Sequence, residues 1–539
     1  MPSTATSGAA KVRRYFLSNV VGTFVSRAFG FAREMVVGGA FGASQATDVF
    51  VVAFTIPTLF RRVLGEEMVE RALLPSFKTL IEQGKRAEAW LLISRLGNLM
   101  LLALLMGMGL CYSFARPLVD FIAPGLDQES ARIAVTLTYI VLPFMVFIGL
   151  YALLGGMLLF LEEVTAFAFS PIMLSVGVIG VVPFFADALG APSLAAGFLV
   201  GGILQALFCI PFLFRRRLRE KYQPRYHLSV SISGPQMRVV GRESFWILLS
   251  AVAVKAVDIV DRMLASHLPQ GSISALYFAD RLNELPLAIL GLTLARALLP
   301  PLTDAAARGD MADFVATLTK GLRYNALLVG PISLLMIALS LPIVRVIYQR
   351  AAFDDADARM TALALACYAA GLFGTTGYGL LTRSFSALIS NRAAVLISLC
   401  GMVVIIGLKA WLVTTPLAHG GLALATSISF TGMTAVMLFA VRRVVRERGA
   451  ELPLAPIAHT IGIALLGSLV AAAVAYATWY GVDRLGLTPL RLRWLDVSAL
   501  LGVAAGGIVG GTVYALVLAA LGVGEVRTAW HWLLARVKR

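Results

Sequence analysis

Charged residues and cysteine are both scarce in this chain of 539 residues. Charged side chains make up 14% of it, hydrophobic residues make up 59%, and the mean hydropathy is +0.83. These values exclude a soluble globular protein and indicate an all-α integral protein that crosses a membrane many times. The only cysteines, Cys111, Cys209, Cys367 and Cys400, stand alone in apolar stretches. Their spacing indicates neither a disulfide framework nor a metal site.

Motifs for catalysis and for nucleotide binding are also missing. The sequence has no Gly-rich loop with the lysine of a Walker motif, so a bound nucleotide is not the expected energy source. Its five histidines are scattered and lie mostly in loops or near the ends of apolar runs. An enzyme acting at a membrane face would need a cluster of histidines or carboxylates there. We therefore expect no catalytic residue, no metal site and no cofactor.

Basic residues outnumber acidic ones, 46 to 30, which gives a formal net charge of +16. Such a charge can indicate nucleic-acid binding. Here, however, most lysines and arginines lie in short segments between apolar runs, as the positive-inside rule expects of cytoplasmic loops. We attribute the charge to membrane topology and expect no nucleic-acid partner.

Apolar runs of about 20 residues, the length that crosses a bilayer, predict fourteen helices. Their expected ranges are 15–41, 47–80, 88–113, 131–159, 166–187, 193–214, 237–266, 272–303, 314–344, 358–388, 392–414, 419–444, 457–481 and 497–521. Lysine and arginine are far more numerous in the connections on the N-terminal side, which places both termini in the cytoplasm. Two connections disagree with this orientation: the acidic pair Glu162 and Glu163 on the inner side, and an outer loop with Arg484, Arg491 and Arg493. The first apolar run has no small-residue cleavage site, so we expect a retained span.

A short repeat indicates how these helices are organised. The sequence Arg-Ala-Leu-Leu-Pro occurs at 71–75 and again at 296–300, at the ends of the second and eighth expected spans. An offset of six spans preserves orientation and fits two parallel six-helix lobes. The expected organisation is an N-terminal lobe over 1–214, a basic cytoplasmic linker over 215–242, a C-terminal lobe over 243–448, and two further helices with a basic tail over 449–539.

Several charged side chains fall inside the first two expected spans. They are Arg27, Arg33, Asp48, Arg61, Arg62, Glu66 and Glu67. A charge at the bilayer centre costs about 2.5–3.5 kcal/mol, so such residues usually face a bundle interior or a water-filled cavity. Arginine suits phosphate or carboxylate, because its planar fork binds two oxygens at once and stays charged. The pattern predicts an intramembrane site for a polar solute that carries phosphate, although nearby acidic residues keep the local net charge close to zero.

The geometry of the first span constrains two of these arginines. On a regular helix Arg27 and Arg33 would lie about 9 Å apart along the axis and about 120° apart around it. They can share one face only if the helix bends, and Gly30 is a position where we expect a bend. Pro57 is expected to break the second span before Arg61 and to free backbone groups toward a cavity.

A second group of charges lies in the seventh and eighth expected spans. It consists of Lys255, Asp258, Asp261 and Arg262, followed by Asp280, Arg281 and Glu284. Their spacing by three and four residues places the side chains along helix stripes. Two interpretations stay open: a site that faces a common interior, or local ion pairs in which Lys255 and Arg262 neutralise Asp258.

Several of these stretches resemble a known family. They are 26–34 (SRAFGFARE), 46–50 (ATDVF), 53–57 (AFTIP) followed by Arg61 and Arg62, and 277–282 (YFADRL) followed by Glu284 and Pro286. With these motifs, and over essentially its whole length, the chain resembles the MurJ (MviN) lipid II flippases of bacterial peptidoglycan synthesis, which belong to the multidrug/oligosaccharidyl-lipid/polysaccharide exporter superfamily. It departs from the family pattern at 66–68 and 73–75, where Glu-Glu-Met and Leu-Leu-Pro replace a Glu-Gly-Ala stretch and a Phe-Val-Pro.

The resemblance implies two six-helix lobes around a central cationic cavity in the bacterial inner membrane. It implies movement of the undecaprenyl-diphosphate-linked disaccharide pentapeptide, lipid II, from the cytoplasmic to the periplasmic leaflet. The residues expected to bind this substrate are Arg27, Arg33, Arg61 and Arg281. Further candidates for cavity charge or ion coupling are Asp48, Glu66, Asp258, Asp261, Arg262, Asp280 and Glu284. The last two helices fit the family's hydrophobic groove for the polyprenyl tail.

The expected mechanism is alternating access about a site near the midplane. No bond is made or broken, so the energy would come from the membrane potential, an ion gradient or consumption of the product outside. The expected partners are lipid II, membrane lipids and proteins of cell-wall synthesis. Two related functions stay open: a flippase for another polyprenyl-diphosphate-linked saccharide, and a cation-coupled multidrug exporter of the same superfamily. The exporter should rely on acidic and aromatic cavity residues rather than on arginines.

Overall fold

The computed structural model is a helical membrane protein that divides into two compact units, Met1–Gln270 and Gly271–Arg539. It describes residues 4–61, 69, 73–161, 163–215, 226–231, 237, 255–388, 391–484, 491–492 and 495–523. Within these ranges nine helices are long and apolar enough to cross a membrane, or up to eleven if each bent pair counts as one span. The expected polytopic, all-α class is confirmed. The lobe boundaries at 214, 242 and 448 stay a prediction.

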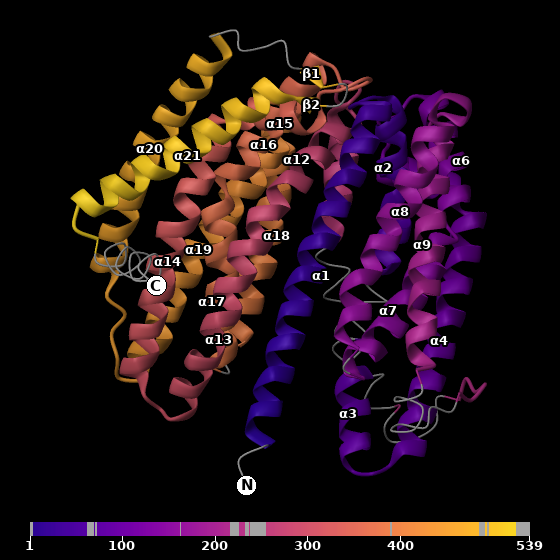
Figure 1. Cartoon of the computed structure of the whole chain (residues 1–539), viewed down its shortest axis with the longest axis horizontal. Coiled ribbons are helices and arrows are strands. Elements are labelled where there is room, and N and C mark those ends of the chain that lie inside the picture. Colours follow the sequence, from indigo (N-terminus) through magenta and orange to yellow (C-terminus); the bar gives the residue numbers. More distant parts are fainter. Residues whose placement is uncertain are drawn as a thin grey trace. The chain divides into compact units, whose positions relative to one another are not determined.

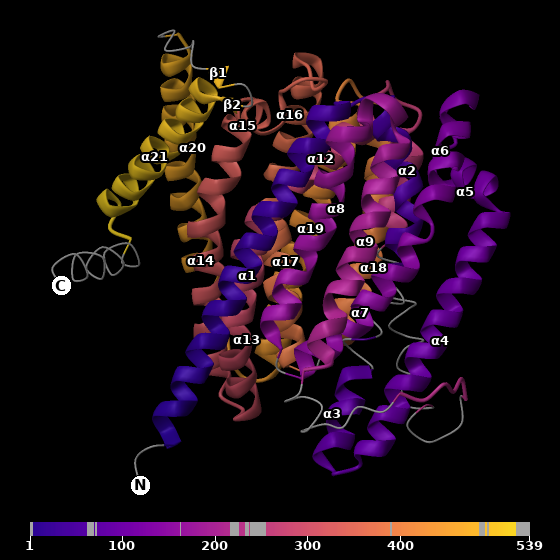
Figure 2. The same ribbon diagram turned by 45° about the vertical axis from the view of Figure 1, so that its right-hand side comes forward.

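The first unit is built from helices that are labelled in Figures 1 and 2. They are α1 (Thr4–Phe41), α2 (Gln45–Phe60), α3 (Leu74–Glu82), α4 (Arg86–Ser113), α5 (Ala115–Ile122), α6 (Gln128–Val141), α7 (Phe144–Phe160), α8 (Val164–Leu189) and α9 (Pro192–Leu213), with a further helical stretch over 255–265. Helix α8 lies between α1 and α9 and packs along both (Figures 1 and 2).

The second unit is also helical, apart from one very short hairpin. Its elements are α12 (Ser272–Pro286), the π-helix η3 (Leu287–Gly291), α13 (Leu292–Ala307), α14 (Met311–Ala338), α15 (Ser340–Tyr348), α16 (Asp355–Ala370), α17 (Leu372–Ala387), α18 (Asn391–Leu412), α19 (His419–Glu447), α20 (Leu454–Arg484), β1 (Arg491–Leu492), β2 (Leu495–Asp496) and α21 (Val497–Ala520). Strands β1 and β2 pair antiparallel and join α20 to α21.

Each of the fourteen expected spans contains helix, but several are interrupted. The expected span 131–159 is the pair α6 and α7, which meet at 40° around Pro143. The span 358–388 is the pair α16 and α17, which meet at 40° around Gly371. Both breaks follow from residues that weaken a helix, since proline lacks an N–H and glycine lacks a side chain. The short helix α5 has no counterpart in the expected set.

One expectation about the first two spans needs correction, and another stays a prediction. Helix α1 runs through Gly30 as one continuous helix of 38 residues, so the helix is not broken there, and a bend at Gly30 stays a prediction. Helix α2 contains Pro57 and extends to Phe60, so the expected break does not fall at the proline. The backbone N–H of Arg61 still donates to the carbonyl oxygens of Pro57 and Thr58.

Glycine brings α8 and α9 into close contact. A Cβ atom at Gly177 would lie 2.3 Å from Cα of Gly201, and a Cβ at Gly201 would lie 2.5 Å from the carbonyl oxygen of Leu174. Real Cβ atoms do not approach so closely. Small residues at helix interfaces are the usual route to tight packing in membranes, where the hydrophobic effect does not drive helices together.

The acidic connection that disagreed with the positive-inside rule has a local explanation. Oε2 of Glu163 accepts a hydrogen bond of 2.7 Å from Nη1 of Arg215, at the end of α9. The guanidinium of Arg215 also lies over the ring of Phe212, 4.6 Å from its centroid. Glu163, just before α8, is therefore bonded to Arg215, just after α9. This contact lies on the side of the membrane where basic residues are more numerous.

Part of the predicted linker, the segment 226–231, is bound to α4. Nδ2 of Asn98 donates to the carbonyl oxygens of His227 at 3.1 Å and Ser229 at 2.9 Å. The N–H of His227 donates to the hydroxyl of Ser94 at 3.1 Å. Polar side chains within an apolar helix need such partners, because lipid offers none. The contact explains why α4 carries Ser94 and Asn98, both buried, one turn apart.

We expect Asn98→Leu to release this segment from α4. The substitution removes three hydrogen bonds, because the Tyr226 hydroxyl also donates to Oδ1 of Asn98. Each is worth about 0.5–1.5 kcal/mol, so backbone exchange should accelerate by about tenfold or more. Hydrogen–deuterium exchange of peptides covering 226–231 measures this change. The control is Ser113→Ala, also on α4, whose hydroxyl donates to the local carbonyl oxygen of Gly109. Unchanged exchange in the Asn98 variant would show that the segment is held by other contacts.

In the second unit, α12 is packed through an aromatic cluster. The cluster consists of Phe278 on α12, Tyr348 and Phe353, all of them fully buried. The ring centroid of Phe278 lies 4.8 Å from that of Tyr348 and 5.5 Å from that of Phe353. The Tyr348 hydroxyl also donates to the carbonyl oxygen of Phe278 at 3.4 Å. This cluster fixes α12 just before its charged residues Asp280 and Arg281.

The last two helices are anchored to α14. Nε of Arg323 donates to Oγ1 of Thr460 on α20 at 3.0 Å, and the hydroxyl of Tyr514 on α21 donates to the carbonyl oxygen of Leu327 at 2.8 Å. In Figure 2 the two helices appear in orange and yellow beside α14. They form part of the second unit rather than a separate domain.

Candidate functional site

Arg33 is held by a neighbouring carboxylate and an aromatic ring. Its Nη2 and Nε donate to Oε1 of Glu34 at 2.6 and 3.1 Å, and its guanidinium lies 5.3 Å from the ring centroid of Phe198 on α9. The side chain of Arg33 is 16% exposed and that of Glu34 is 4% exposed. Nη1 of Arg33 makes no hydrogen bond within the described part of the chain. A partly buried guanidinium fixed in this way keeps donors for an anion while its orientation is set.

Arg27, on the same helix, is in a more open environment. Its side chain is half-buried, and it forms no hydrogen bond or ion pair with the residues that the structure describes. Phe24, one turn away, is 74% exposed. Helix α1 is unbroken between Arg27 and Arg33, and a regular helix offsets two such residues by about 9 Å along the axis and about 120° around it.

The acidic residue of the second span lies at the start of α2. Asp48 is 6% exposed and sits in the first helical turn, where a negative charge is favoured by the helix dipole. Its neighbour Thr47 donates to the carbonyl oxygen of Gly42 at 2.8 Å, which ties α2 to the turn after α1. Arg61 lies at the opposite end of α2 and is half-buried. At 1.5 Å per residue the two backbone positions are about 20 Å apart, so they belong to opposite ends of the helix.

The charges at 255–262 are satisfied in part by one another. Nζ of Lys255 forms an ion pair with Oδ2 of Asp258, and Nη1 of Arg262 donates to the carbonyl oxygen of Asp258 at 3.4 Å. The local ion pair considered from the sequence is therefore present for Lys255, whereas Arg262 reaches the backbone and not the carboxylate. Asp261 is 8% exposed.

The charges of the eighth span form another local group on α12. Nη1 of Arg281 donates to Oε2 of Glu284 at 2.7 Å, and its guanidinium lies over the ring of Tyr277, 5.0 Å from the centroid. The side chains of Arg281 and Glu284 are 35% and 53% exposed. Asp280 is half-buried beside them. The group is therefore accessible, in contrast to the buried aromatic cluster that precedes it.

Within the first unit, candidate residues form one local group on α1 with α9 and another over 255–262, and the second unit has a local group of its own on α12. Glu66, Arg62 and Glu67 lie outside the described residues. Tyr277 was not a candidate, although its spacing of four residues from Arg281 is a helical signal that could have identified it. Phe198 had no such signal, because it is far from Arg33 in the sequence.

The described ranges contain no group of three or more His, Cys, Asp or Glu side chains that could hold a metal ion. The chemistry available in the groups above is anion binding by arginine. Arg33 and Arg281 each contact an acidic and an aromatic neighbour that orient the guanidinium, and the planar fork of arginine suits phosphate oxygens.

A family model described as Lipid II flippase MurJ matches residues 37–489. The matched range includes Asp48, Arg61 and Arg281, and it begins after Arg27 and Arg33. The chain is 31% identical over 412 residues to the lipid II flippase MurJ of Burkholderia cenocepacia, covering 75% of this chain and 79% of that protein. It is 27% identical over 507 residues to a probable lipid II flippase MurJ of Vibrio cholerae, covering 89% and 93%.

Solved structures show the same fold. A lipid II flippase MurJ in an inward closed conformation aligns with a TM-score of 0.74 at 22% identity, covering 93% of this chain and 99% of that chain. An inward-facing multidrug resistance MATE family transporter of the MOP superfamily aligns with a TM-score of 0.62 at 14% identity, covering 78% and 95%. The extent of the family match and the identity to the Burkholderia protein establish that the chain belongs to the lipid II flippase MurJ family.

Proposed function

We propose that this chain moves lipid II from the cytoplasmic to the periplasmic leaflet of the bacterial inner membrane by alternating access. Membership of a flippase family makes it a multi-pass membrane transporter. The observation that carries the residue assignment is Arg33, whose guanidinium is oriented by Glu34 and Phe198 and retains donors for a diphosphate. Arg27, Arg61 and Arg281 complete the proposed set of substrate ligands.

The proposed transport cycle needs no cofactor and no enzymatic step. The lobes over 1–214 and 243–448 would rock about the bound headgroup while the polyprenyl tail stays in the bilayer. Asp48, Asp258, Asp261 and Asp280 are proposed sites where a coupling ion or the membrane potential acts, since charges within the bilayer respond to both. Both termini would be cytoplasmic, and proteins of cell-wall synthesis would be partners.

Complementation tests the proposal. A bacterium is depleted of its resident lipid II flippase, this chain is expressed, and both survival and the access of lipid II to an external probe are measured. We expect rescue by the native chain. We expect loss of rescue, at normal membrane abundance, in Arg27→Ala and Arg281→Ala.

A matched control uses an arginine outside the proposed set. Arg116 on α5 is 49% exposed and pairs with Asp120 one turn away, so Arg116→Ala should rescue fully. If the native chain reaches the membrane and does not rescue, lipid II transport is ruled out. Assays with another polyprenyl-diphosphate-linked saccharide and drug-efflux assays would then distinguish the two remaining functions.

A further inference from the structure

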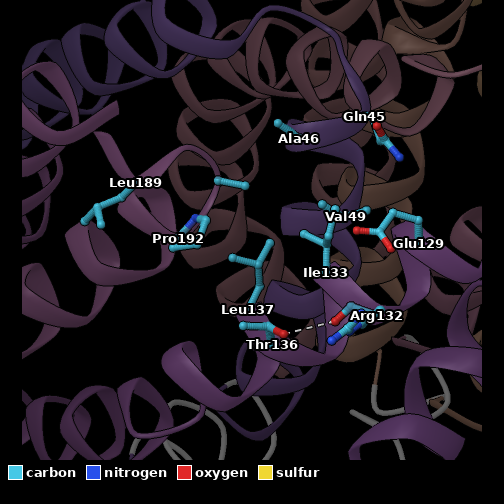
Figure 3. Close-up of a pocket in the computed structure, with 11 residues that line it drawn as sticks. Gln45, Ala46, Val49, Glu129, Arg132, Ile133, Thr136, Leu137, Leu189 and Pro192 are labelled. Atoms are coloured by element: carbon cyan, nitrogen blue, oxygen red, sulfur yellow. Dashed lines mark hydrogen bonds between the residues drawn. The ribbon is translucent and has the colours of Figure 1, made fainter. Parts of the chain in front are cut away.

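A pocket of about 410 Å³ opens at one end of the first unit, beside the start of α2, which also carries Asp48 in its first turn. It lies where α2 and α6 begin and where α8 turns into α9 (Figure 3). Its lining residues are Gln45, Ala46, Val49, Glu129, Arg132, Ile133, Thr136, Leu137, Leu189, Ala191 and Pro192. In the orientation proposed above, this end of the unit faces the periplasm.

The polar side of the pocket carries two opposite charges that do not pair with each other. Glu129 and Arg132 lie three residues apart on α6, so their Cβ atoms are neighbours at about 5–6 Å. Both are exposed, and neither side chain forms an ion pair within the described ranges. Gln45, beside them in Figure 3, is already engaged, since its Nε2 donates to Oγ of Ser130 at 2.5 Å.

The acidic residue that precedes α6 is not available to the pocket. The hydroxyl of Ser130 donates to Oδ1 of Asp127, and the backbone N–H groups of Ser130 and Glu129 donate to its Oδ2. These hydrogen bonds lower the pKa of Asp127 from its ordinary value. Asp127 therefore serves as the N-terminal cap of α6, which leaves Glu129 as the acidic group that faces the pocket.

The opposite side of the pocket is apolar. Figure 3 shows Leu189 and Pro192 across the hollow from Glu129 and Arg132. Val49, Ile133 and Leu137 line the region between them. A ligand here would place charged groups against α6 and apolar groups against the end of α8.

The position of the pocket along α6 matches the membrane–water interface. Tyr139, seven residues after Arg132 and on the same helix face, is 42% exposed. Its ring stacks on that of Tyr112 with centroids 5.5 Å apart, and the Tyr112 hydroxyl donates to the Tyr139 carbonyl oxygen at 2.8 Å. Exposed tyrosines concentrate at the headgroup level. Arg132 lies about 10 Å farther toward the helix start, where headgroups meet water.

We propose that this pocket binds the headgroup of a zwitterionic glycerophospholipid of the outer leaflet, one with a phosphate and a primary ammonium. The phosphate would accept hydrogen bonds from Arg132, whose fork suits two oxygens. The ammonium would donate to Glu129, and the start of an acyl chain would cover Leu189 and Leu137. An anionic lipid without the ammonium satisfies Arg132 alone and leaves Glu129 without a partner.

Lipid titration of the full chain in detergent, followed by native mass spectrometry, tests this site. Phosphatidylethanolamine and phosphatidylglycerol with identical acyl chains are the probes. Loss of one charge-assisted contact should weaken binding by about tenfold. We expect Glu129→Gln to weaken binding of phosphatidylethanolamine only and Arg132→Gln to weaken binding of both lipids. Thr136→Trp should block the pocket with both charges in place.

The matched controls are Asp120→Asn and Arg116→Gln, which remove the same charges from the exposed pair on α5. These variants should bind one phosphatidylethanolamine as the native chain does. The proposal is wrong if Glu129→Gln has no effect on either lipid, or if the α5 variants lose the lipid equally. Displacement of the phosphatidylethanolamine by a polyprenyl diphosphate would also overturn it, because the pocket would then belong to the transport path.

Discussion

The double variant Arg33→Ala with Glu34→Gln is expected to reach the membrane at the normal level and to fail in transport. Removing Arg33 alone would take the guanidinium from Glu34, which is 3% exposed, and a buried carboxylate that loses its counter-charge destabilises a fold. Neutralising Glu34 relieves that cost. Without the arginine, two charge-assisted hydrogen bonds to the diphosphate are lost, each worth about 1.5–3 kcal/mol, so transport should fall by about a hundredfold or more. Lipid II access to an external probe in flippase-depleted cells measures the loss.

Two further variants separate binding from structural support. Glu34→Gln alone keeps the guanidinium over Phe198 and should retain most transport. Arg33→Lys keeps the charge and loses the planar fork, so it should give an intermediate rate. Full rescue by the double variant would mean that Arg33 serves only to neutralise Glu34, and the assignment of Arg33 to the substrate would be withdrawn.

Gly201→Leu is expected to prevent the first unit from packing. Its Cβ would lie 2.5 Å from the carbonyl oxygen of Leu174 and 3.0 Å from the Leu174 Cα, both of them backbone atoms that cannot move aside without shifting α8. Overpacking of side chains costs about 1–3 kcal/mol, and a clash with backbone should exceed that range. The expected result is a collapse in membrane abundance and early melting, which size-exclusion chromatography after heating detects.

The matched control is Gly180→Leu, three residues after Gly177 on α8. A Cβ at Gly180 meets nothing within 4 Å, so this larger side chain should leave abundance and melting unchanged. Equal loss in both variants would indicate that the loss does not come from the close contact between Gly201 and Leu174. Normal behaviour of Gly201→Leu would show that α8 and α9 can separate without harm.

The spans could be predicted because hydrophobic length is a local property of the sequence. Helices α4, α8 and α9 begin and end within about three residues of the expected limits, within the usual uncertainty at helix ends. The short helix α5 escaped prediction because its eight residues are too few for an apolar run. The breaks at Pro143 and Gly371 lie inside long apolar stretches. Hydropathy alone predicts a single span for each of these stretches.

The candidate site was predictable where charges act within one helix. Spacing by three residues identified Lys255 with Asp258, and the Arg281 group follows the same rule. The contact between Arg33 and Phe198 was not predictable, because it depends on how α1 and α9 are brought together. Neither was the attachment of the linker segment to Asn98, which joins residues 129 positions apart.

The unbroken course of α1 gives it the properties of a lever. Its 38 residues span about 57 Å at 1.5 Å per residue, whereas the hydrocarbon core of a bilayer measures about 30 Å. A rigid rod of that length that pivots by about 10° near Phe41 carries its other end through about 10 Å. Small reorientations of Arg33 close to the pivot would thus become displacements at Thr4 large enough for distance spectroscopy, which makes the start of α1 a sensitive place for a probe of the transport cycle.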